Sequence, residues 1–313
     1  MRAWLFTDAG EPLRLLERAD PRPGPGEVVV DVRAAGLCHS DVGCLDGTIT
    51  AIMPKRPIVL GHEVAGVISS LGPDVADFTV GDRVVVLGPD DFAPGWTADG
   101  GYATHCLVRT EGLVRLADSV SFVQGATATD AGATSYGAVM HAGELRSGQR
   151  VGIVGLGGLG MTGARIAVLN GAEVYAAEPR HEVWDLAKEQ GVIEVVDDVR
   201  ALARHRPHLI VDFAGFDTTT AGAVEAVRRR GLVVQVGLGR AHATISTTAL
   251  TANMVTLRGH RGGEPAALRG VLEHMAAGEL AISATTIGFD DVPDGLERLA
   301  VGGVVGRIVA VPS

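Results

Sequence analysis

The chain has 313 residues, enough for two hydrophobic cores, and 46% hydrophobic with only 4% aromatic residues is typical of a globular α/β protein. A formal net charge of −10 argues against nucleic acid or an anionic membrane surface as a partner. No apolar run is long enough to predict a membrane span, and an acid at position 8 argues against a secretory leader. The three cysteines are odd in number and too few for a disulfide scaffold, so we expect a cytoplasmic protein.

The first part of the chain is rich in short β-type runs separated by glycine and proline. Such a series of short strands predicts a small barrel or sandwich. The predicted strands cover residues 28–35, 63–70, 83–87 and 102–108.

After residue 121 the pattern changes to strands that alternate with helices, which predicts a parallel sheet covered on both faces. The helices are predicted at 122–142 with an interruption at Gly132, and at 159–169, 181–190, 219–230 and 265–277. The strands are predicted at 150–155, 173–177, 209–213 and 231–236. A last strand at 306–311 resembles those of the first part, so residues 132–259 are predicted to form a domain inserted between 1–131 and a returning segment, 260–313.

A glycine motif follows the strand at 150–155 and opens a helix. In that context Gly155 allows a tight turn, Gly157 lets the backbone approach a pyrophosphate, and Gly160 lets the helix pack on the strand. The phosphates would lie at the helix N-terminus, beside Gly158 and Leu159. The alternative is that these glycines only turn a strand into a helix.

Glu178 stands about twenty residues beyond the motif, at the end of the next predicted strand. A carboxylate there accepts hydrogen bonds from ribose hydroxyls and repels a 2′-phosphate, which favours NAD over NADP. Arg180 leaves NADP open, because a guanidinium two residues on is able to reach a 2′-phosphate.

Cys38 and His62 both border predicted strands in the first part of the chain. They are separated by twenty-three residues and belong to no recurrent zinc motif, so their spacing alone is equally consistent with a buried cysteine and a core histidine.

Five stretches follow one another along the chain: Gly36-Leu-Cys-His-Ser-Asp41, Val59-Leu-Gly-His-Glu-Val-Ala-Gly66, Gly81-Asp-Arg-Val84, Asp99-Gly-Gly-Tyr102 and the glycine motif. In this order they resemble the zinc-dependent alcohol dehydrogenase family of the medium-chain dehydrogenases/reductases. The resemblance implies a GroES-like catalytic domain and a Rossmann coenzyme domain, and it covers essentially the whole chain.

The resemblance implies a catalytic zinc ion held by Cys38 and His62. The family's third ligand, usually a cysteine, corresponds to Asp130 in Asp130-Ala-Gly-Ala-Thr134-Ser-Tyr136. A carboxylate is an acceptable replacement, because its oxygen binds zinc at about 2.0–2.2 Å. Glu63 resembles the residue that approaches the zinc during ligand exchange. The alternative is that Asp130 only caps a helix or is exposed.

The resemblance also assigns catalytic and coenzyme residues. Ser40 would accept the alcohol proton, and Asp41 would fix the tautomer of the zinc-bound imidazole. The histidine that ends this proton relay in many relatives is replaced by Gly43, so the end of the relay is in doubt. The implied coenzyme contacts are Thr134 beside the nicotinamide, backbone at Val236, Gly237 and Leu238 at the carboxamide, and His39 and Arg307 on the pyrophosphate side.

Residues 87–99 contain no cysteine, whereas relatives often carry a four-cysteine zinc lobe there. A short form with one zinc ion per chain is therefore expected. Thr48, Ile49, Phe92, Trp96 and His260 are candidates for the substrate pocket, whose ligand stays open. The strand near Met254 resembles the family's dimer edge, so the resemblance implies a homodimer or homotetramer.

The activity implied is hydride transfer between an alcohol or carbonyl compound and a nicotinamide coenzyme, with zinc polarising the oxygen. Two alternatives remain: a zinc-free quinone or enoyl reductase on the same scaffold, and an inactive dinucleotide-binding protein. The Cys38, His62 and Glu63 set argues against the first, and Ser40 and Asp41 argue against the second.

Overall fold

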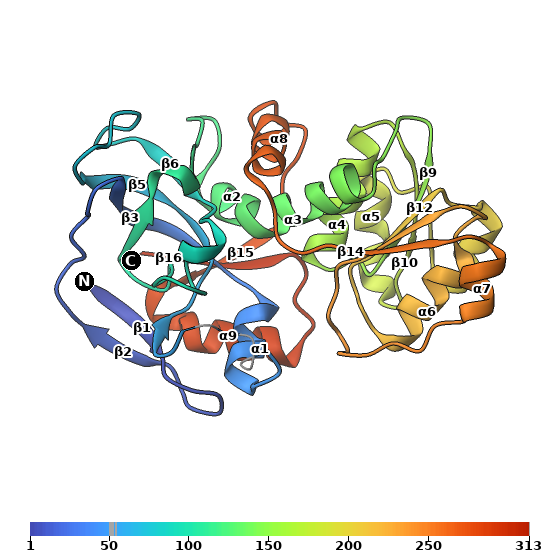
Figure 1. Ribbon diagram of the computed structural model, residues 1–313, viewed down its shortest axis with the longest axis horizontal. Helices are drawn as coiled ribbons and strands as arrows, with labels where there is room; N and C mark the ends of the chain where they lie inside the picture. The colour runs from blue at the N-terminus through green and yellow to red at the C-terminus, as the bar shows by residue number, and fades with distance from the viewer. Residues whose placement is uncertain (50–52, 54, 313) are drawn as a thin grey trace. The chain divides into compact units, whose positions relative to one another are not determined.

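The computed structural model describes residues 1–49, 53 and 55–312. The chain forms two compact units, the first from Met1–Asp130 with Leu268–Ser313 and the second from Ala131–Ala267 (Figure 1). The return to the first unit was predicted at residue 260, but residues 260–267 belong to the second unit. The reason is local: the His260 backbone N–H bonds to the Gln235 carbonyl, and Gly263 packs closely against Ala133.

The first unit is built on β-sheet, as predicted. In the described residues a larger sheet has the strand order β15-β16-β3-β5-β6-β8, with β7 also paired to β3, and a smaller sheet has the order β2-β1-β4. Shifts of register between β3 and β5 bend the larger sheet around its core. The strands are β1 (Arg2–Phe6), β2 (Arg14–Glu17), β3 (Glu27–Leu37), β4 (Ile58–Val59), β5 (Glu63–Leu71), β6 (Arg83–Val86), β7 (His105–Arg109), β8 (Leu113–Arg115), β15 (Ala284–Gly288) and β16 (Arg307–Val311).

The last strand, β16, pairs antiparallel with β3 in the first unit, which agrees with its predicted place. Helix α1 (His39–Asp46) begins directly after β3 and packs against α9 (Val292–Val301). Neither helix was predicted: α1 is short with little apolar periodicity, whereas α9 has the apolar spacing of an amphipathic helix, a signal that the sequence does contain. The other helices of this unit are α2 (Phe122–Thr127), α8 (Pro265–Ala276), which extends from the boundary, and the 3₁₀ turns η2 (Asp90–Phe92), η3 (Thr110–Gly112) and η8 (Phe289–Asp291).

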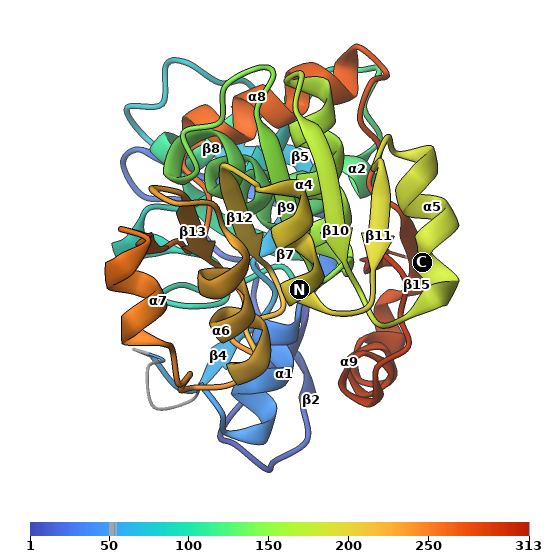
Figure 2. The ribbon, with the colours of Figure 1, turned by 90° about the vertical axis from the view of Figure 1, so that its right-hand side faces the viewer.

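The second unit is a parallel sheet with the strand order β11-β10-β9-β12-β13-β14 (Figure 2). Its order reverses between β9 and β12, and dinucleotides bind at such a reversal, at the carboxyl ends of the strands. The strands are β9 (Arg150–Val154), β10 (Glu173–Ala177), β11 (Glu194–Val196), β12 (Leu209–Asp212), β13 (Leu232–Gln235) and β14 (Thr256–Gly259). The helices are α3 (Ala133–Tyr136), α4 (Gly158–Leu169), α5 (Trp184–Glu189), α6 (Asp217–Ala226), α7 (Thr247–Ala252), and the 3₁₀ segments η6 (His181–Val183) and η7 (Val199–His205).

The helix predicted at 122–142 forms, but Gly132 does not interrupt it. Two π-helical segments, η4 (Ala128–Gly132) and η5 (Gly137–Ala142), flank α3 within one continuous helical stretch. π-Helical turns occur frequently at functional sites, because the wider turn re-aims side chains. Asp130 lies in the first of them.

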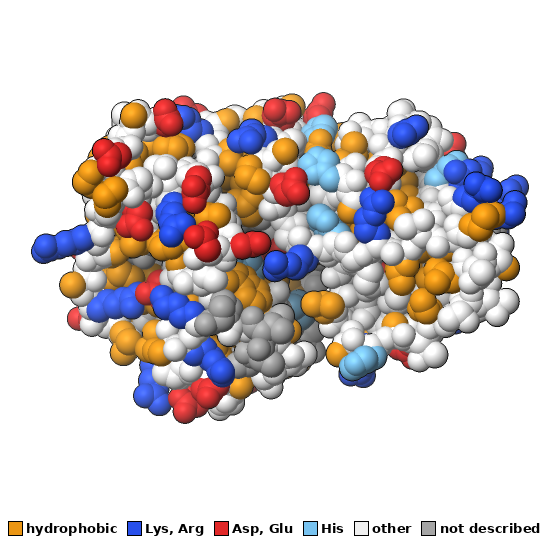
Figure 3. Space-filling view, viewed as in Figure 1, with side chains coloured by type: hydrophobic (Ala, Val, Ile, Leu, Met, Phe, Trp, Pro, Cys, Tyr) orange, Lys and Arg blue, Asp and Glu red, His pale blue; other side chains and the backbone are white. Residues whose placement is uncertain are grey.

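Acidic and basic side chains are interspersed with hydrophobic ones over most of the face in Figure 3. Within the described residues no helix has the length and apolarity needed to cross a bilayer. At the edge of the parallel sheet, β14 leaves Leu257 and the preceding Met254 exposed.

Candidate metal centre and dinucleotide-binding edge

Four potential metal ligands from distant parts of the sequence converge in the first unit. One ligand atom from each of Cys38, His62, Glu63 and Asp130 lies within 4.8 Å of all the others. These are the four residues proposed as metal ligands from the sequence, and among the described residues they are the one such cluster.

Cys38 is positioned by the junction of β3 and α1. It is the N-cap of α1, where its Sγ accepts a hydrogen bond from the Ser40 N–H at 3.5 Å. Asp41 completes a capping box, because its Oδ2 accepts from the Cys38 N–H at 3.0 Å. The buried strand and this cap fix the thiol in place.

His62 directly precedes β5 and follows a glycine that the fold requires. Gly61 has φ +90°, and a Cβ on it would lie 2.6 Å from the Tyr102 ring. The His62 Nδ1 lies 3.5 Å from Asp41 Oδ1, and its Nε2 lies 3.9 Å from Asp130 Oδ2. Asp41 on one side of the ring therefore leaves Nε2 turned toward the other ligands.

Burial by itself would lower the pKa of His62, but the carboxylates of Asp41 and Asp130 raise it well above its ordinary value. Zinc binds the neutral imidazole, so a proton and a metal ion compete at this ring.

Glu63 is fully buried, and the neighbouring strand makes room for it. A Cβ on Gly36 would lie 2.2 Å from Glu63 Oε2. Its Oε1 forms an ion pair with Arg307, whose Nη2 also lies 3.2 Å from Asp130 Oδ2. In this structure the Arg307 guanidinium therefore contacts two of the proposed metal ligands, and its predicted pyrophosphate contact stays a prediction.

Asp130 lies 3.3 Å from Cys38 Sγ through its Oδ2. Asp130 is not an exposed acid, because its side chain is only 18% exposed and belongs to the cluster. Thiolate, imidazole and carboxylate are all zinc donors, and their convergence on one buried point fits a tetrahedral zinc ion.

Tyr102 is a site residue to which no role was given from the sequence. Its hydroxyl donates to Asp41 Oδ2 at 2.7 Å, and burial followed by the Asp41 charge raises the pKa of Tyr102 well above its usual value. It was visible as the last residue of Asp99-Gly-Gly-Tyr102. Ser40 lies beside the cluster, with Oγ 3.6 Å from Cys38 Sγ.

The glycine motif of the second unit lies at the carboxyl end of β9. Gly155 has φ +82°, and a Cβ on Gly160 would lie only 1.7 Å from the Gly155 carbonyl oxygen. A Cβ on Gly157 would meet nothing within 4 Å. Gly155 and Gly160 are thus required by the turn and its packing, whereas Gly157 faces open space suited to a ligand.

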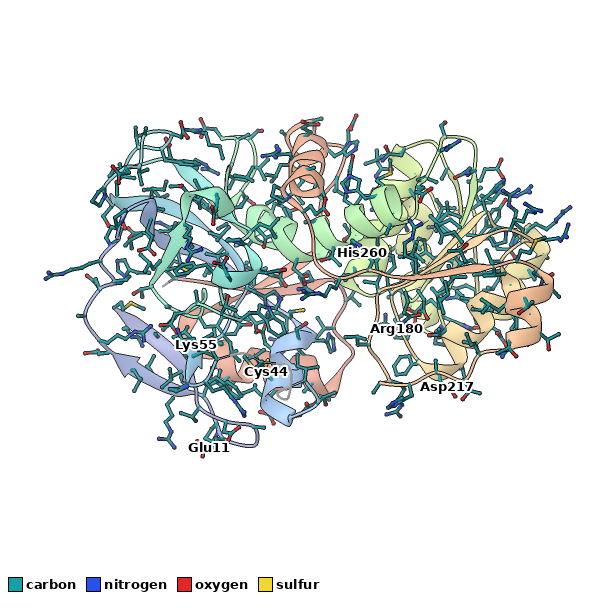
Figure 4. All side chains as sticks on the ribbon, viewed as in Figure 1. Glu11, Cys44, Lys55, Arg180, Asp217 and His260 are labelled. Carbon is teal, nitrogen blue, oxygen red and sulfur yellow. The ribbon has the colours of Figure 1, made fainter. Side chains whose placement is uncertain are left out.

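Glu178 follows β10 and accepts hydrogen bonds from four donors, one of them the Arg180 backbone N–H at 3.0 Å. Its Oε2 accepts from the Leu156 N–H of the glycine loop at 2.7 Å, and both oxygens pair with the Arg180 guanidinium, labelled in Figure 4. Burial alone would raise the pKa of Glu178, but the bonds from Arg180 and Leu156 lower it below its ordinary value. The Arg180 guanidinium is therefore already paired with a carboxylate, that of Glu178.

Of the remaining predicted coenzyme residues, Thr134 is buried in α3, and Val236, Gly237 and Leu238 follow β13 at the carboxyl edge of the sheet. The Val236 and Gly237 N–H groups both bond to the Asp212 carbonyl, and Leu238 is exposed. His39 begins α1 in the first unit, where desolvation and then the Arg307 charge lower its pKa.

The pocket candidates have different local surroundings. The Trp96 ring lies 6.0 Å from the His62 ring, close enough to border a ligand there. Phe92 instead lies under Arg109 and lines a different cavity of about 340 Å³ with Arg18 and His105. His260 belongs to the second unit, where it packs against Gly137.

Comparison with known proteins agrees with this arrangement. Residues 24–118 match the alcohol dehydrogenase GroES-like domain, and residues 158–277 match the zinc-binding dehydrogenase domain. The chain is 30% identical to an alcohol dehydrogenase of Geobacillus stearothermophilus, with 99% of each chain covered. It is 28% identical to an NAD-dependent alcohol dehydrogenase of Sulfurisphaera tokodaii, with full coverage of both.

Solved structures give the same result. An alcohol dehydrogenase from Aeropyrum pernix superposes with a TM-score of 0.92 at 28% identity over the whole of both chains. A cobalt- and zinc-bound alcohol dehydrogenase from Pyrobaculum aerophilum gives 0.90 at 26% identity, covering 100% of this chain and 99% of that one.

The chain belongs to the zinc-type alcohol dehydrogenases of the medium-chain dehydrogenase/reductase superfamily. It is accordingly an oxidoreductase of the alcohol dehydrogenase/reductase class, with a GroES-like unit and a Rossmann unit. The predicted family and fold are confirmed, and the short form agrees with the 313-residue length.

Proposed function

We propose that this protein interconverts an alcohol and a carbonyl compound with one catalytic zinc ion and NAD. The observation that carries the proposal is the convergence of Cys38, His62 and Asp130 within the four-residue cluster, next to the Asp41–His62 pair. We assign these three residues as the ligands and Glu63 as a carboxylate available for ligand exchange.

When bound, zinc supplies a Lewis acid that polarises the substrate oxygen, and the nicotinamide ring accepts or returns hydride. Asp41 orients the His62 ring and is itself held by the Tyr102 hydroxyl and the Cys38 N–H. Ser40 is proposed to take the alcohol proton, since its hydroxyl lies beside the Cys38 thiol. Gly43 offers no side chain to continue the relay, so water or His39 is proposed to carry the proton onward.

The coenzyme is proposed to bind at the carboxyl edge of the parallel sheet, with its pyrophosphate over Gly157 and the N-terminus of α4. The ionised Glu178 supports NAD over NADP, because it would repel a 2′-phosphate. We propose Thr134 and the backbone of Val236–Leu238 for the nicotinamide end.

We further propose a cytoplasmic homo-oligomer. In the described residues the three cysteines are buried and form no disulfide, as suits a reducing compartment. Burial, followed by a nearby acid, raises the pKa of Cys44 and of Cys106 to about 12. The exposed edge of β14, with Leu257, offers a surface for self-association.

Metal analysis and an absorbance assay of NAD reduction test the proposed function directly. About one zinc per chain is expected, together with alcohol-dependent reduction of NAD that a chelator abolishes and zinc restores. A protein that binds NAD but holds no zinc would contradict the proposal and favour a zinc-free reductase on the same scaffold.

Zinc binding is expected to weaken as the pH falls. The pKa of His62 is raised, so its ring is protonated over a wider range of pH than a free imidazole, and zinc must displace that proton. The apparent affinity should therefore begin to fall well above about pH 6.5, the ordinary histidine pKa. Competition of the metal-stripped protein with a chromophoric chelator, over roughly pH 6 to 9, measures this.

Asp41→Asn provides the comparison for the pH series, because Asp41 is the largest influence that raises the pKa of His62. In this variant the fall in apparent zinc affinity should begin at a lower pH. An unchanged pH profile in Asp41→Asn would exclude the Asp41–His62 pair as its cause.

Glu178→Gln is expected to reduce the preference for NAD over NADP by roughly tenfold or more. A neutral amide still accepts the Leu156 N–H bond, but it neither repels a 2′-phosphate nor retains Arg180 by charge. The ratio of dissociation constants for the two coenzymes, from fluorescence titration, is the measurement. Glu182→Gln removes a nearby exposed acid and should leave the ratio unchanged; equal ratios in all three proteins would assign Glu178 a structural role only.

A further inference from the structure

Arg307 is a buried cation in direct contact with two of the proposed metal ligands. Its side chain is 5% exposed, and its Nη2 contacts both Glu63 Oε1 and Asp130 Oδ2. The family's usual cysteine at position 130 would offer no carboxylate for the second contact. Arg307 therefore places a positive charge inside this metal site, paired with both Glu63 and Asp130.

The backbone itself fixes this arrangement. On one side of β3, Gly36 pairs with Glu63 of β5, and on the other side Leu37 pairs with Ile308 of β16. The residues that flank these pairs, Cys38 and Arg307, are thus brought to the same end of three adjacent strands. Arg307 reaches the ligand cluster because of sheet register, and Figure 1 shows β3, β5 and β16 together in the first unit.

A guanidinium at this place weakens zinc binding but stabilises the folded, metal-free protein. It remains charged at all relevant pH values, and within a buried site its repulsion of a divalent cation is weakly screened. The same charge compensates Glu63 and Asp130, two carboxylates that would otherwise be buried close to each other. The guanidinium and a metal ion therefore compete for the same oxygens.

We propose that Arg307 sets the metal affinity of this site by sharing the carboxylates of Glu63 and Asp130 with zinc. A neutral side chain at position 307 then gives tighter zinc binding and a less stable metal-stripped protein. This inference depends on the proposed zinc site and goes beyond it, because it gives Arg307 a role in metal binding that is separate from any contact with the coenzyme.

The test compares wild type, Arg307→Met, Arg307→Gln and Arg307→Lys after removal of metal with a chelator. Zinc dissociation constants come from competition with a chromophoric chelator, and Tm values from thermal unfolding with and without zinc. Arg307→Met and Arg307→Gln should bind zinc at least tenfold more tightly than wild type. Without zinc their Tm should be several degrees lower than that of wild type, and added zinc should largely restore it. Arg307→Lys keeps the charge and should stay within about threefold of wild type.

Arg83→Met is the matched control, since Arg83 is another partly buried arginine of the first unit, packed over Phe122 and away from the cluster. Its zinc affinity should equal that of wild type. If a neutral variant cannot be stripped without unfolding, the rate at which a chelator removes zinc from the loaded protein is measured, and slower loss is expected.

Weaker or unchanged zinc binding in both neutral variants would overturn the inference. Unchanged zinc binding with a large loss of NAD affinity would assign Arg307 to the coenzyme instead. Failure of the wild type to bind zinc would contradict the proposed function itself. The wild-type protein alone shows this outcome, so it is distinguishable from a failure of the inference about Arg307.

Discussion

Asp130→Ala is expected to lose its zinc and, with it, at least 100-fold in kcat/KM for alcohol oxidation. Asp130 Oδ2 lies 3.3 Å from Cys38 Sγ and 3.9 Å from His62 Nε2, so its removal opens one side of the proposed ligand set. The loss also removes one of the two carboxylates that contact Arg307 and leaves the ion pair with Glu63. Zinc content by atomic emission, with the NAD-linked assay, measures both effects.

Asp130→Cys is the informative control, because it restores the thiolate usual in the family and should retain zinc. Asp130→Ala with full zinc content would remove Asp130 from the ligand set and transfer its role to Glu63, the remaining carboxylate of the cluster. NAD titration of every variant separates a metal defect from a folding defect, because the glycine motif lies in the other unit.

Two alanine substitutions in the glycine motif are expected to fail in different ways. Gly160→Ala places a Cβ 1.7 Å from the Gly155 carbonyl oxygen, so the turn must move, at a cost of about 1–3 kcal/mol or more. Gly157→Ala places its Cβ in open space, so the protein should fold normally yet lose NAD affinity by roughly tenfold or more. Denaturant unfolding and NAD titration together measure the two effects.

Gly148→Ala supplies a comparison for the unfolding experiment. It also lies in the second unit, and a Cβ there meets nothing, but its φ of +78° introduces backbone strain without a ligand role. It should lose some stability and keep its NAD affinity. Normal NAD binding by Gly157→Ala would argue that the phosphates do not pass over that residue.

The fold class could be predicted from the sequence because hydrophobic periodicity and turn residues are local signals. The alternation after residue 121 predicted the parallel strands, and β10 has the predicted bounds, Glu173–Ala177. Some elements were missed: α1 is short with little apolar periodicity, and β15 is an edge strand with exposed residues, whereas a strand near Met254, where β14 lies, was expected. The position of such elements depends on the strands and helices against which they pack.

The sequence by itself determined which residues are able to do chemistry. Cys38, His62, Glu63 and Asp130 were proposed through the resemblance to the family, and Gly157 and Glu178 from the glycine motif, since the chemistry of each side chain is a property of the residue. What the motifs left open was which groups share a carboxylate, because a carboxylate accepts from any donor that the fold brings near.

The tertiary structure decided those partners. Sheet register brings Arg307 onto Glu63 and Asp130, although the sequence placed it with the coenzyme. Packing brings the Tyr102 hydroxyl to Asp41, sixty-one residues away, and folds Arg180 onto Glu178. Such pairings depend on the long-range register and on desolvation, which strengthens interactions between buried charges, and no local pattern in the chain records either of them.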